Sequence, residues 1–301
     1  MLGKRAPRRM FNLQNIKEFI SKPLFDERVI LKKDQSYPRI SIVTPSFNQG
    51  QFLERTILSV LNQNYPNLEY IIIDGGSNDG SIEIIKKYSK YLSYWTSEKD
   101  KGQSNAINKG FEKSTGDILA WLNSDDIYLP GALVFISKYM EQNKNVEMVY
   151  GRCYIIDKDD KILKESYTVP FDPIFYLHKL ISIAQPASFW RRSLYLIAGP
   201  LNEQNYTCMD HELFVRFIKI GATIVYIDRL FAGFRIHPAS ISGSGRLVSQ
   251  YKKDISEIQK GILGYNPQRM DLLLKKLYLI IRHPYYNFRY IFSNIYKYIY
   301  R

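Results

Sequence analysis

Hydrophobic and polar positions along the first half of the chain alternate between two periods. A buried strand is predicted at Ile40–Thr44, where a short apolar run ends at Pro45 and a polar turn. After this turn the apolar positions recur at helical spacing from Leu53 to Leu61. A strand that is followed by a turn and an amphipathic helix is the first part of a βαβ unit.

The same order recurs twice further along the chain. Tyr70–Ile73 is predicted as a second strand that ends on Asp74, and the glycine-rich turn Gly75–Gly80 leads from it into a short helix. Gly116–Ala120 is a third apolar run, and Pro130 opens a helical pattern after it. Strands that alternate with helices in this way predict an α/β fold with parallel strands.

The second half of the chain continues the pattern less regularly. It predicts a strand at Met148–Gly151, a hairpin built from residues 153–157 and 162–165, and a helix from Arg192 that ends at Gly199. A further helix is predicted around Asp210–Phe217, before a strand at Leu230–Phe234.

Two adjacent carboxylates, Asp125 and Asp126, follow the third predicted strand directly. Paired acids cost free energy unless a cation or a hydrogen-bonding ligand is close. At the carboxyl end of a strand in an α/β sheet that partner is usually a bound ligand, and hard oxygen ligands suit Mg²⁺ or Mn²⁺. The alternative is a solvated loop that merely contains two acids.

Several common site types are disfavoured. The turn Gly75–Gly80 has the glycine spacing of a phosphate loop but lacks the lysine that should follow, and no dinucleotide-binding G-x-G-x-x-G follows a strand. The two cysteines, Cys153 and Cys208, are too far apart to suggest zinc, and they suggest reduced thiols in a cytoplasmic setting.

Four motifs, in this order, resemble family 2 glycosyltransferases with the GT-A fold. They are Val43–Asn48, Ile73–Gly80, Trp95–Phe111 and Trp121–Asp126. The resemblance spans roughly Pro38 to Ser242. It implies a nucleotide-binding, mostly parallel sheet flanked by helices, and an inverting enzyme of bacterial cell-surface glycan synthesis that uses a nucleoside-diphosphate sugar.

The resemblance also implies the donor site. Asp74 would accept a hydrogen bond from the nucleotide base, although a carboxylate that caps its own turn is the alternative. Thr44, Pro45 and Phe47 would shape the wall around base and ribose. In full, the residues expected to bind the nucleotide sugar are Thr44, Pro45, Phe47, Asp74, Asp100, Asn108, Ser124, Asp125 and Arg235.

The expected cation is Mn²⁺ or Mg²⁺, which would bridge the diphosphate. Asp126 is its expected principal ligand. In an Arg-x-His element, His237 is also expected to ligate the cation, and Arg235 is expected to neutralise phosphate; a structural histidine is the alternative for His237. The family motif is often Asp-x-Asp, whereas this chain has Ser124-Asp125-Asp126. This departure leaves open which acid touches the metal directly.

Asp210 is the expected catalytic base, since the resemblance places it where an inverting transferase removes a proton from the acceptor hydroxyl. The alternative is an acid that stabilises the start of a helix, and Glu212 is the fallback base. The expected acceptor is a lipid-linked or growing surface glycan. The rivals are transfer to a polyprenyl phosphate, and a silent sugar-nucleotide-binding or scaffold protein on the same fold.

The formal net charge is +13 at pH 7, with a pI of about 9.4. Nucleic-acid binding is not expected, because no helix-turn-helix, zinc finger or stacking platform accompanies the charge. Residues 272–301 mix basic with aromatic and aliphatic side chains, which suits either an amphipathic helix on an anionic membrane or a helical cap on the core. No apolar run reaches the ~18 residues of a membrane span. A cytoplasmic enzyme, peripheral on the inner face of the membrane, is expected.

The predicted organisation is a single catalytic domain with two additions. Residues 1–37 form an N-terminal extension of uncertain order. Residues 38–245 form the GT-A domain, divided into a nucleotide-sugar half at 38–151 and an acceptor half at 152–245. Residues 246–301 form a helical tail.

Overall fold

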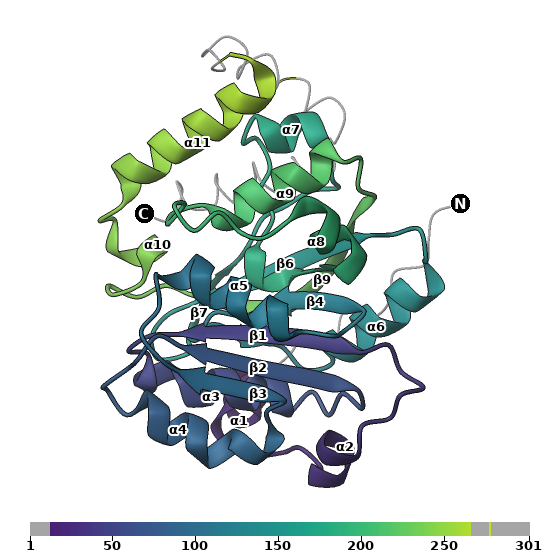
Figure 1. Ribbon diagram of the computed structural model, residues 1–301, viewed down its shortest axis with the longest axis vertical. Coiled ribbons are helices and arrows are strands. Elements are labelled where there is room, and N and C mark those ends of the chain that lie inside the picture. The colour runs from purple at the N-terminus through teal and green to yellow at the C-terminus, as the bar shows by residue number, and fades with distance from the viewer. Residues whose placement is uncertain (1–12, 266–276, 278–301) are drawn as a thin grey trace, which may run out of the picture.

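The strands and helices of the first half form the parallel part of one sheet, as predicted (Figure 1). The structure is a computed structural model that describes residues 13–265 and residue 277. The strands are β1 (Ile40–Ser46), β2 (Leu68–Asp74), β3 (Tyr94–Ser97) and β4 (Ile118–Trp121), and the helices between them are α3 (Gly50–Leu61), α4 (Ser81–Tyr88), the 3₁₀ turn η1 (Ser89–Tyr91) and α5 (Gln103–Lys113). All three pairs among these strands are parallel.

The second half extends the same sheet with antiparallel and parallel pairs. Its strands are β5 (Ile127–Tyr128), β6 (Met148–Ile156), β7 (Ile162–Glu165), β8 (Ser188–Arg191) and β9 (Ile224–Arg235). Its helices are α6 (Ala132–Gln142), α7 (Pro173–Leu177), the 3₁₀ turn η2 (Gln185–Ala187), α8 (Arg192–Ala198), α9 (Met209–Lys219), α10 (Ile241–Ser244) and α11 (Val248–Leu263). The predicted hairpin is confirmed as β6 and β7, but the strand expected at 148–151 is the first part of the same long β6.

The sheet order places the strand ends that carry the motifs side by side. The strands follow the order β3-β2-β1-β4-β8-β6-β9-β5, with β7 beside β6. The chain therefore moves outward from β1 to β3 and then returns to the other side of β1 with β4. Such a reversal leaves a crevice outside the carboxyl ends of the central strands, where α/β proteins bind ligands.

Alternating side chains of the strands supply two cores, one on each face of the sheet. Ile40 and Ile42 of β1 are fully buried under α3, α4 and α6, whereas Val43 packs with α5, α8 and α9 on the opposite face. Because successive side chains of a strand point to opposite faces, a strand covered on both sides is apolar throughout. The uninterrupted apolar runs that predicted these strands have this origin.

Two helices lie within the predicted N-terminal extension. They are α1 (Leu13–Ser21) and α2 (Glu27–Lys32). Ile16 and Ile20 of α1 are buried against β5 and the end of β6, and Ile30 of α2 joins the core under α3. The extension therefore contributes side chains to the core from Ile16 onward.

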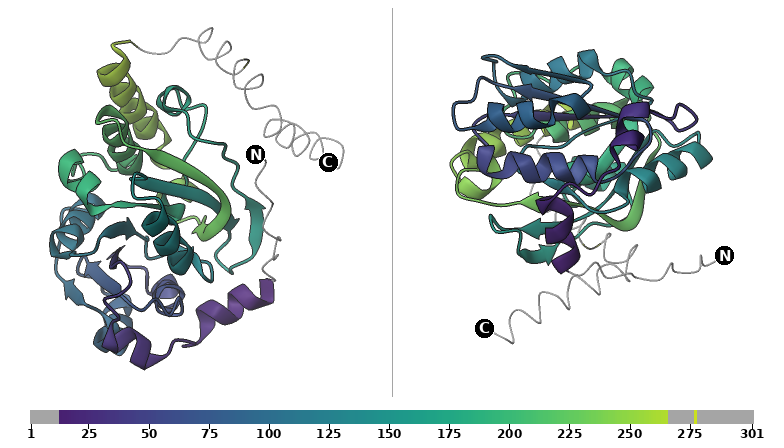
Figure 2. Two further views of the ribbon diagram at one scale, coloured as in Figure 1. Left: turned by 90° about the vertical axis from the view of Figure 1, so that its right-hand side faces the viewer. Right: turned by 90° about the horizontal axis from the view of Figure 1, so that it is seen from below.

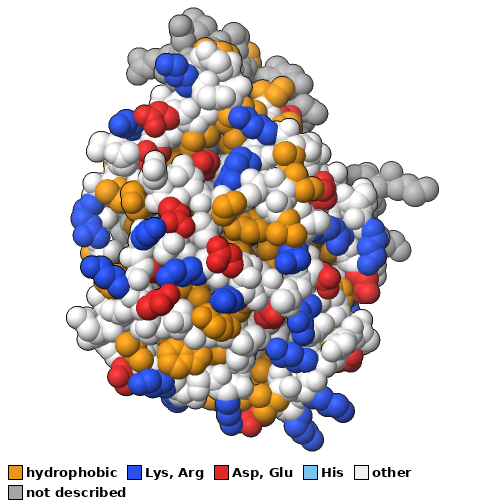
Figure 3. Space-filling view, viewed as in Figure 1, with side chains coloured by type: hydrophobic (Ala, Val, Ile, Leu, Met, Phe, Trp, Pro, Cys, Tyr) orange, Lys and Arg blue, Asp and Glu red, His pale blue; other side chains and the backbone are white. Residues whose placement is uncertain are grey.

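At the other end of the molecule, α11 lies within the predicted tail of residues 246–301 (Figures 1 and 2). Of residues 272–301, on which the membrane prediction depends, only Leu277 is among the described residues, so that prediction lies outside the described part of the chain. No helix within 13–265 is both long and apolar enough to span a membrane. On the face drawn in Figure 3, acidic side chains are interspersed among the basic ones.

Candidate active site

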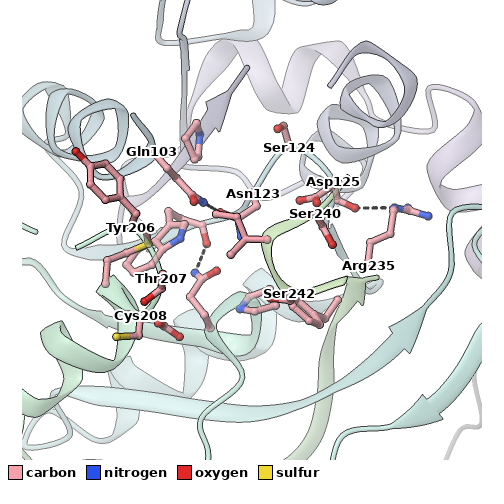
Figure 4. A pocket seen from close by; sticks show the side chains of 18 of the residues that line it. Gln103, Asn123, Ser124, Asp125, Tyr206, Thr207, Cys208, Arg235, Ser240 and Ser242 are labelled. Atoms are coloured by element: carbon pink, nitrogen blue, oxygen red, sulfur yellow. Dashed lines mark hydrogen bonds between the residues drawn. The ribbon is translucent and has the colours of Figure 1, made fainter. Parts of the chain in front are cut away.

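A cavity of about 1230 Å³ opens at the carboxyl ends of the central strands and continues past α9 toward α11. One end, where the sequence predicts the donor nucleotide and which is called the donor end, is formed by the turns after β1, β2 and β4 and by the loop before α5. The other end is formed by the start of α9, the end of β9, α10 and the first turn of α11. Figure 4 shows side chains from both ends, from Ser124 and Asp125 to the run Tyr206, Thr207 and Cys208.

The donor end combines an exposed aromatic ring with a carboxylate. Phe47 keeps 59% of its surface exposed at the cavity wall. Oδ1 of Asp100 accepts a hydrogen bond from the Gly102 amide at 2.8 Å. A Cβ on Gly75 would lie 2.9 Å from Oδ2 of Asp100 and 3.2 Å from the Phe47 ring. Glycine at position 75 therefore lets the carboxylate and the ring approach each other.

Asp74 is turned into its own turn rather than toward the cavity. Its carboxylate accepts hydrogen bonds from the Gly76 and Ser77 amides, at 3.1 and 2.9 Å, and from the Ser77 and Ser97 hydroxyls, at 2.6 and 2.7 Å. The side chain is fully buried. This is the turn-capping alternative, and contact with the base stays a prediction.

Two further expected donor-site residues lie behind the cavity wall. Thr44 is fully buried, and its hydroxyl is 3.1 Å from the Tyr70 hydroxyl. Asn108 holds the loop before α9, because its side-chain amide donates to the Leu201 carbonyl at 2.9 Å and accepts from the Leu201 amide at 2.8 Å. Both residues support elements that carry cavity residues.

The two adjacent acids have different surroundings. Asp125 lines the cavity with a side chain that is 15% exposed. Asp126 is 1% exposed, and its Oδ1 accepts a hydrogen bond from the Arg235 amide at 2.8 Å. Burial and then the charge of Asp125 hold the pKa of Asp126 well above its ordinary value. Only Asp125 of this pair reaches the cavity wall, so the geometry favours it over the expected Asp126 as the acid that faces a cation.

Arg235 fixes the loop that carries both acids. Its Nε donates to the Asp125 carbonyl at 2.7 Å (Figure 4), and its terminal nitrogens contact the Asp157 carbonyl at 2.7 Å and the Asp160 carboxylate at 2.6 Å. The guanidinium side chain is 0% exposed. Its charge is paired with Asp160, so neutralisation of a ligand phosphate by Arg235 stays a prediction.

His237 stands beside the cavity acid. Its Nε2 lies 3.0 Å from Oδ2 of Asp125, and its ring packs against Phe52 with centroids 4.6 Å apart. Between residues 13 and 265, no three His, Cys, Asp or Glu side chains form a ready metal cluster. The Asp125–His237 pair nevertheless fits a cation that takes its remaining ligands from a diphosphate and water, as Mg²⁺ and Mn²⁺ commonly do.

Asp210 lines the far end of the cavity. Helix α9 begins at Met209, so the N-cap is Cys208, and Asp210 lies in the first turn instead. Burial raises the pKa of Asp210, and the positive charge of Lys179 partly offsets this effect. Glu212 points away from the cavity, as expected, because it accepts a hydrogen bond from Asn205 at 2.7 Å.

Several polar cavity residues were missed by the sequence reasoning, among them Gln103, Asn123 and Lys179. The Gln103 amide donates to the Asn123 side chain at 2.7 Å (Figure 4). Asn123, Ser124 and Asp125 match the spacing of an Asp-x-Asp motif in which asparagine replaces the first aspartate. Asn123 could therefore have been predicted from the sequence. Lys179 lies in a loop after α7 and carried no motif signal.

The sequence of residues 41–196 matches the model of glycosyl transferase family 2. The chain belongs to this family. Among its relatives, an uncharacterised glycosyltransferase of Haemophilus influenzae is 38% identical over 69% of this chain and 83% of that relative. One from Methanocaldococcus jannaschii is 28% identical over 66% of this chain and 71% of that relative.

Solved structures of glycosyltransferases share the fold of this family 2 enzyme. The S. aureus TarS 1–349 structure in complex with UDP-GlcNAc matches with a TM-score of 0.62 and 12% identity, over 77% of this chain and 68% of that one. The mannosyltransferase PcManGT from Pyrobaculum calidifontis, in complex with GDP-Man and Mn²⁺, matches with a TM-score of 0.59 and 16% identity, over 91% of this chain and 78% of that one. The expected GT-A fold is thereby confirmed.

Proposed function

We propose that this family 2 glycosyltransferase moves a sugar from a nucleoside-diphosphate sugar to an acceptor hydroxyl with inversion at the anomeric carbon. The observation that carries this proposal is the placement of two carboxylates in one cavity. Asp125 comes from the loop after β4, and Asp210 comes from the start of α9. A donor and an acceptor would meet between them.

The donor base is assigned to the end of the cavity that contains Phe47 and Asp100. A base would stack on the exposed Phe47 ring and donate a hydrogen bond to Oδ2 of Asp100. Solved relatives of the fold bind UDP-GlcNAc and GDP-Man. Uracil and guanine both carry a ring N–H that can donate to a carboxylate.

Asp125 and His237 would hold the divalent cation. Asp126, the principal ligand predicted from the sequence, is the alternative that experiment must test. A bound cation would supply positive charge that offsets the negative charge of the departing diphosphate. The fit rests on Asp125 at the cavity wall and on His237 behind it, whose Nε2 lies 3.0 Å from Oδ2 of Asp125. Mn²⁺ accompanies GDP-Man in the structure of PcManGT.

Asp210 would act as the general base. Its carboxylate takes the proton from the acceptor hydroxyl while that oxygen forms a bond to the anomeric carbon. The bond from this carbon to the diphosphate oxygen breaks at the same time, and the electron pair leaves with the nucleoside diphosphate. One displacement inverts the anomeric configuration, and the raised pKa of Asp210 brings the base closer to working pH.

A product experiment tests this proposal. Nucleotide sugars are first screened with Mn²⁺ for thermal stabilisation of the protein and for hydrolysis. The anomeric configuration of the released or transferred sugar is then read by NMR during the first minutes of turnover. Inversion is expected. Retention would refute the single displacement, and failure of all nucleotide sugars to bind would refute the transferase itself.

We further propose that the acceptor is a lipid-linked or growing surface glycan and that the tail holds the enzyme at an anionic membrane surface. The support is the mixture of basic and apolar residues at 272–301. A truncation before Leu272 should abolish co-sedimentation with anionic vesicles at low salt and leave nucleotide binding intact. If the full chain ignores such vesicles, or if truncation unfolds the core, the tail is not a membrane anchor.

A further inference from the structure

The acceptor end of the cavity contains a polar cluster that the proposed mechanism does not use. Its members are Tyr176 at α7, Lys179 in the following turn and His211 on α9, all of which line the cavity beside Asp210. The imidazole of His211 packs against the Tyr176 ring, with centroids 4.8 Å apart. We call Tyr176, Lys179 and His211 the acceptor-end cluster.

Lys179 is held in an unusual backbone conformation. Its φ is +57°, in the left-handed region that favours glycine. The turn is fixed by two hydrogen bonds, from the Lys179 amide to the Tyr176 carbonyl at 2.9 Å and from the Leu180 amide to the Phe175 carbonyl at 2.9 Å. The Lys179 backbone is therefore held by its turn in a conformation that glycine would adopt with less strain.

The ammonium group of Lys179 has no carboxylate partner at ion-pair distance among residues 13–265. It stands 5.6 Å from the ring centroid of Tyr251 on α11 and lines the cavity. Its charge acts on both Asp210 and His211. The cavity therefore contains a half-buried cation that lies within the electrostatic reach of Asp210 but, among the described residues, forms no ion pair with it or with another acid.

His211 is buried without hydrogen-bond partners. It is 3% exposed, and neither Nδ1 nor Nε2 contacts a donor or an acceptor in the described part of the chain. Burial, and secondarily the charge of Lys179, lower the pKa of His211 to about 3, so the ring is neutral at physiological pH. A neutral imidazole offers one N–H donor and one acceptor nitrogen. Leaving both unpaired costs free energy that a ligand can recover.

We propose that Lys179 and His211 form a binding site for a phosphate group on the acceptor, next to the hydroxyl that Asp210 deprotonates. This inference rests on the proposed function. An ammonium group and an imidazole N–H are both donors to phosphate oxygens. The Lys179 charge is shared between this phosphate and Asp210, which reduces the repulsion between the two anions.

The cavity beyond the cluster is apolar at its rim. Ile241 of α10 and Val248 and Tyr251 of α11 line it with 42%, 51% and 37% of their surfaces exposed. The organic part of a phosphate ester could lie along these side chains. Two acceptors share this chemistry, namely a lipid phosphate linked to a sugar and a soluble phosphorylated sugar or polyol, and the experiment must separate them.

The first experiment uses His211 as a reporter of phosphate binding. The chain has four histidines, so side-chain NMR signals can be assigned with a His211→Gln variant. The protein is saturated with Mg²⁺, which is diamagnetic, and with UDP or GDP, whichever binds, so that the donor site is filled before inorganic phosphate is titrated. Failure of every nucleoside diphosphate to bind would count against the proposed function and not against this site.

Inorganic phosphate should shift the His211 resonance in the wild type. Lys179→Gln should weaken the binding of phosphate by roughly 10–100-fold, since it removes one charge-assisted hydrogen bond, and Lys179→Arg should restore part of it. Lys253→Gln is the matched control on α11, where the lysine side chain is 67% exposed and pairs with Glu257. It should bind phosphate like the wild type. Equal affinity in all variants, or no shift of His211, would overturn the site.

The second experiment identifies the source of the phosphate. Octyl phosphate should bind more tightly than inorganic phosphate if the apolar rim receives a lipid chain, and Val248→Ser should remove this gain. Equal affinities would assign the site to a soluble phosphorylated acceptor. If the enzyme instead glycosylates octyl phosphate itself, the phosphate is the nucleophile, and the proposal of a binding site beside a hydroxyl is wrong. Lys179 could instead bind a carboxylate on the donor sugar. If nucleotide sugars that carry a uronate bind more tightly than neutral ones only when Lys179 is present, the proposed phosphate site is likewise refuted.

Discussion

The two adjacent acids should separate cleanly under matched substitutions. Asp125→Asn and Asp126→Asn each replace an ionisable carboxyl group by a neutral amide and keep the shape of the side chain. The Asp125 side chain faces the cavity beside His237, whereas the Asp126 carboxylate is occupied by the Arg235 amide. We therefore expect Asp125→Asn to impair metal-dependent binding of the nucleoside diphosphate and Asp126→Asn to leave most of it.

The magnitudes follow from these contacts. Loss of an outer-shell partner at a metal site typically lowers affinity 10–100-fold, so loss of a direct ligand at Asp125 should lower it by at least about 100-fold. Asp126→Ala would instead leave the buried Arg235 amide without an acceptor, which costs about 1–3 kcal/mol. The chain has 301 residues, so its unfolding entropy at Tm is about 0.6 kcal/mol/K and this cost corresponds to a fall in Tm of about 2–5 °C.

Calorimetry of UDP or GDP binding with and without Mn²⁺ supplies the first quantity, and thermal unfolding of the same variants supplies the second. Asn at position 126 is the internal control, because it keeps an oxygen acceptor for the Arg235 amide. If Asp126→Asn abolished metal-dependent binding while Asp125→Asn did not, the geometric reasoning would be refuted and the assignment of Asp126 from the sequence would stand.

The remaining predictions concern the proposed catalytic base, Asp210, and the packing of helix α5 on strand β1. Asp210→Asn should lower turnover by roughly 10²–10⁴-fold with little change in donor affinity, measured by initial rates and calorimetry; wild-type turnover would reduce Asp210 to a helix-terminal acid. Only the ionised Asp210 carboxylate can accept a proton, and burial raises its pKa above 3.8, the ordinary value for Asp. The kcat/KM of the wild type should therefore fall as the pH decreases, with a midpoint above pH 3.8. A midpoint at or below pH 3.8 would contradict this. Gly110→Ala would place a Cβ 2.3 Å from Cγ1 of Val43 and should lower the free energy of unfolding, measured by chemical denaturation, by about 1–3 kcal/mol. At Gly261 an added Cβ would meet nothing within 4 Å, so Gly261→Ala should raise the free energy of unfolding by about 0.5–1 kcal/mol. Equal effects of the two substitutions would argue against close contact between α5 and β1.

The sequence alone was sufficient for the fold class and for the position of the loops that line one end of the cavity. The predicted strand Ile40–Thr44 is β1, the strand that ends on Asp74 is β2, and the run after Gly116 is β4. These features are encoded locally, because a strand buried on both faces must be apolar throughout and a turn at a ligand crevice needs polar and flexible residues. The family motifs then predicted that the nucleotide-sugar half of the site comes first along the chain and the acceptor half second.

The direction of individual side chains depended on the tertiary structure. Asp126 is turned from the cavity by the Arg235 amide, which lies 109 positions later in the chain, and Asp74 is satisfied partly by Ser97 from the neighbouring strand. Lys179 reaches the cavity only because its turn packs beside α9 and α11. The local hydrophobic pattern predicts where a strand ends. It does not predict which of two adjacent acids faces a ligand, because that depends on contacts with residues that are distant in the sequence and come close only on folding.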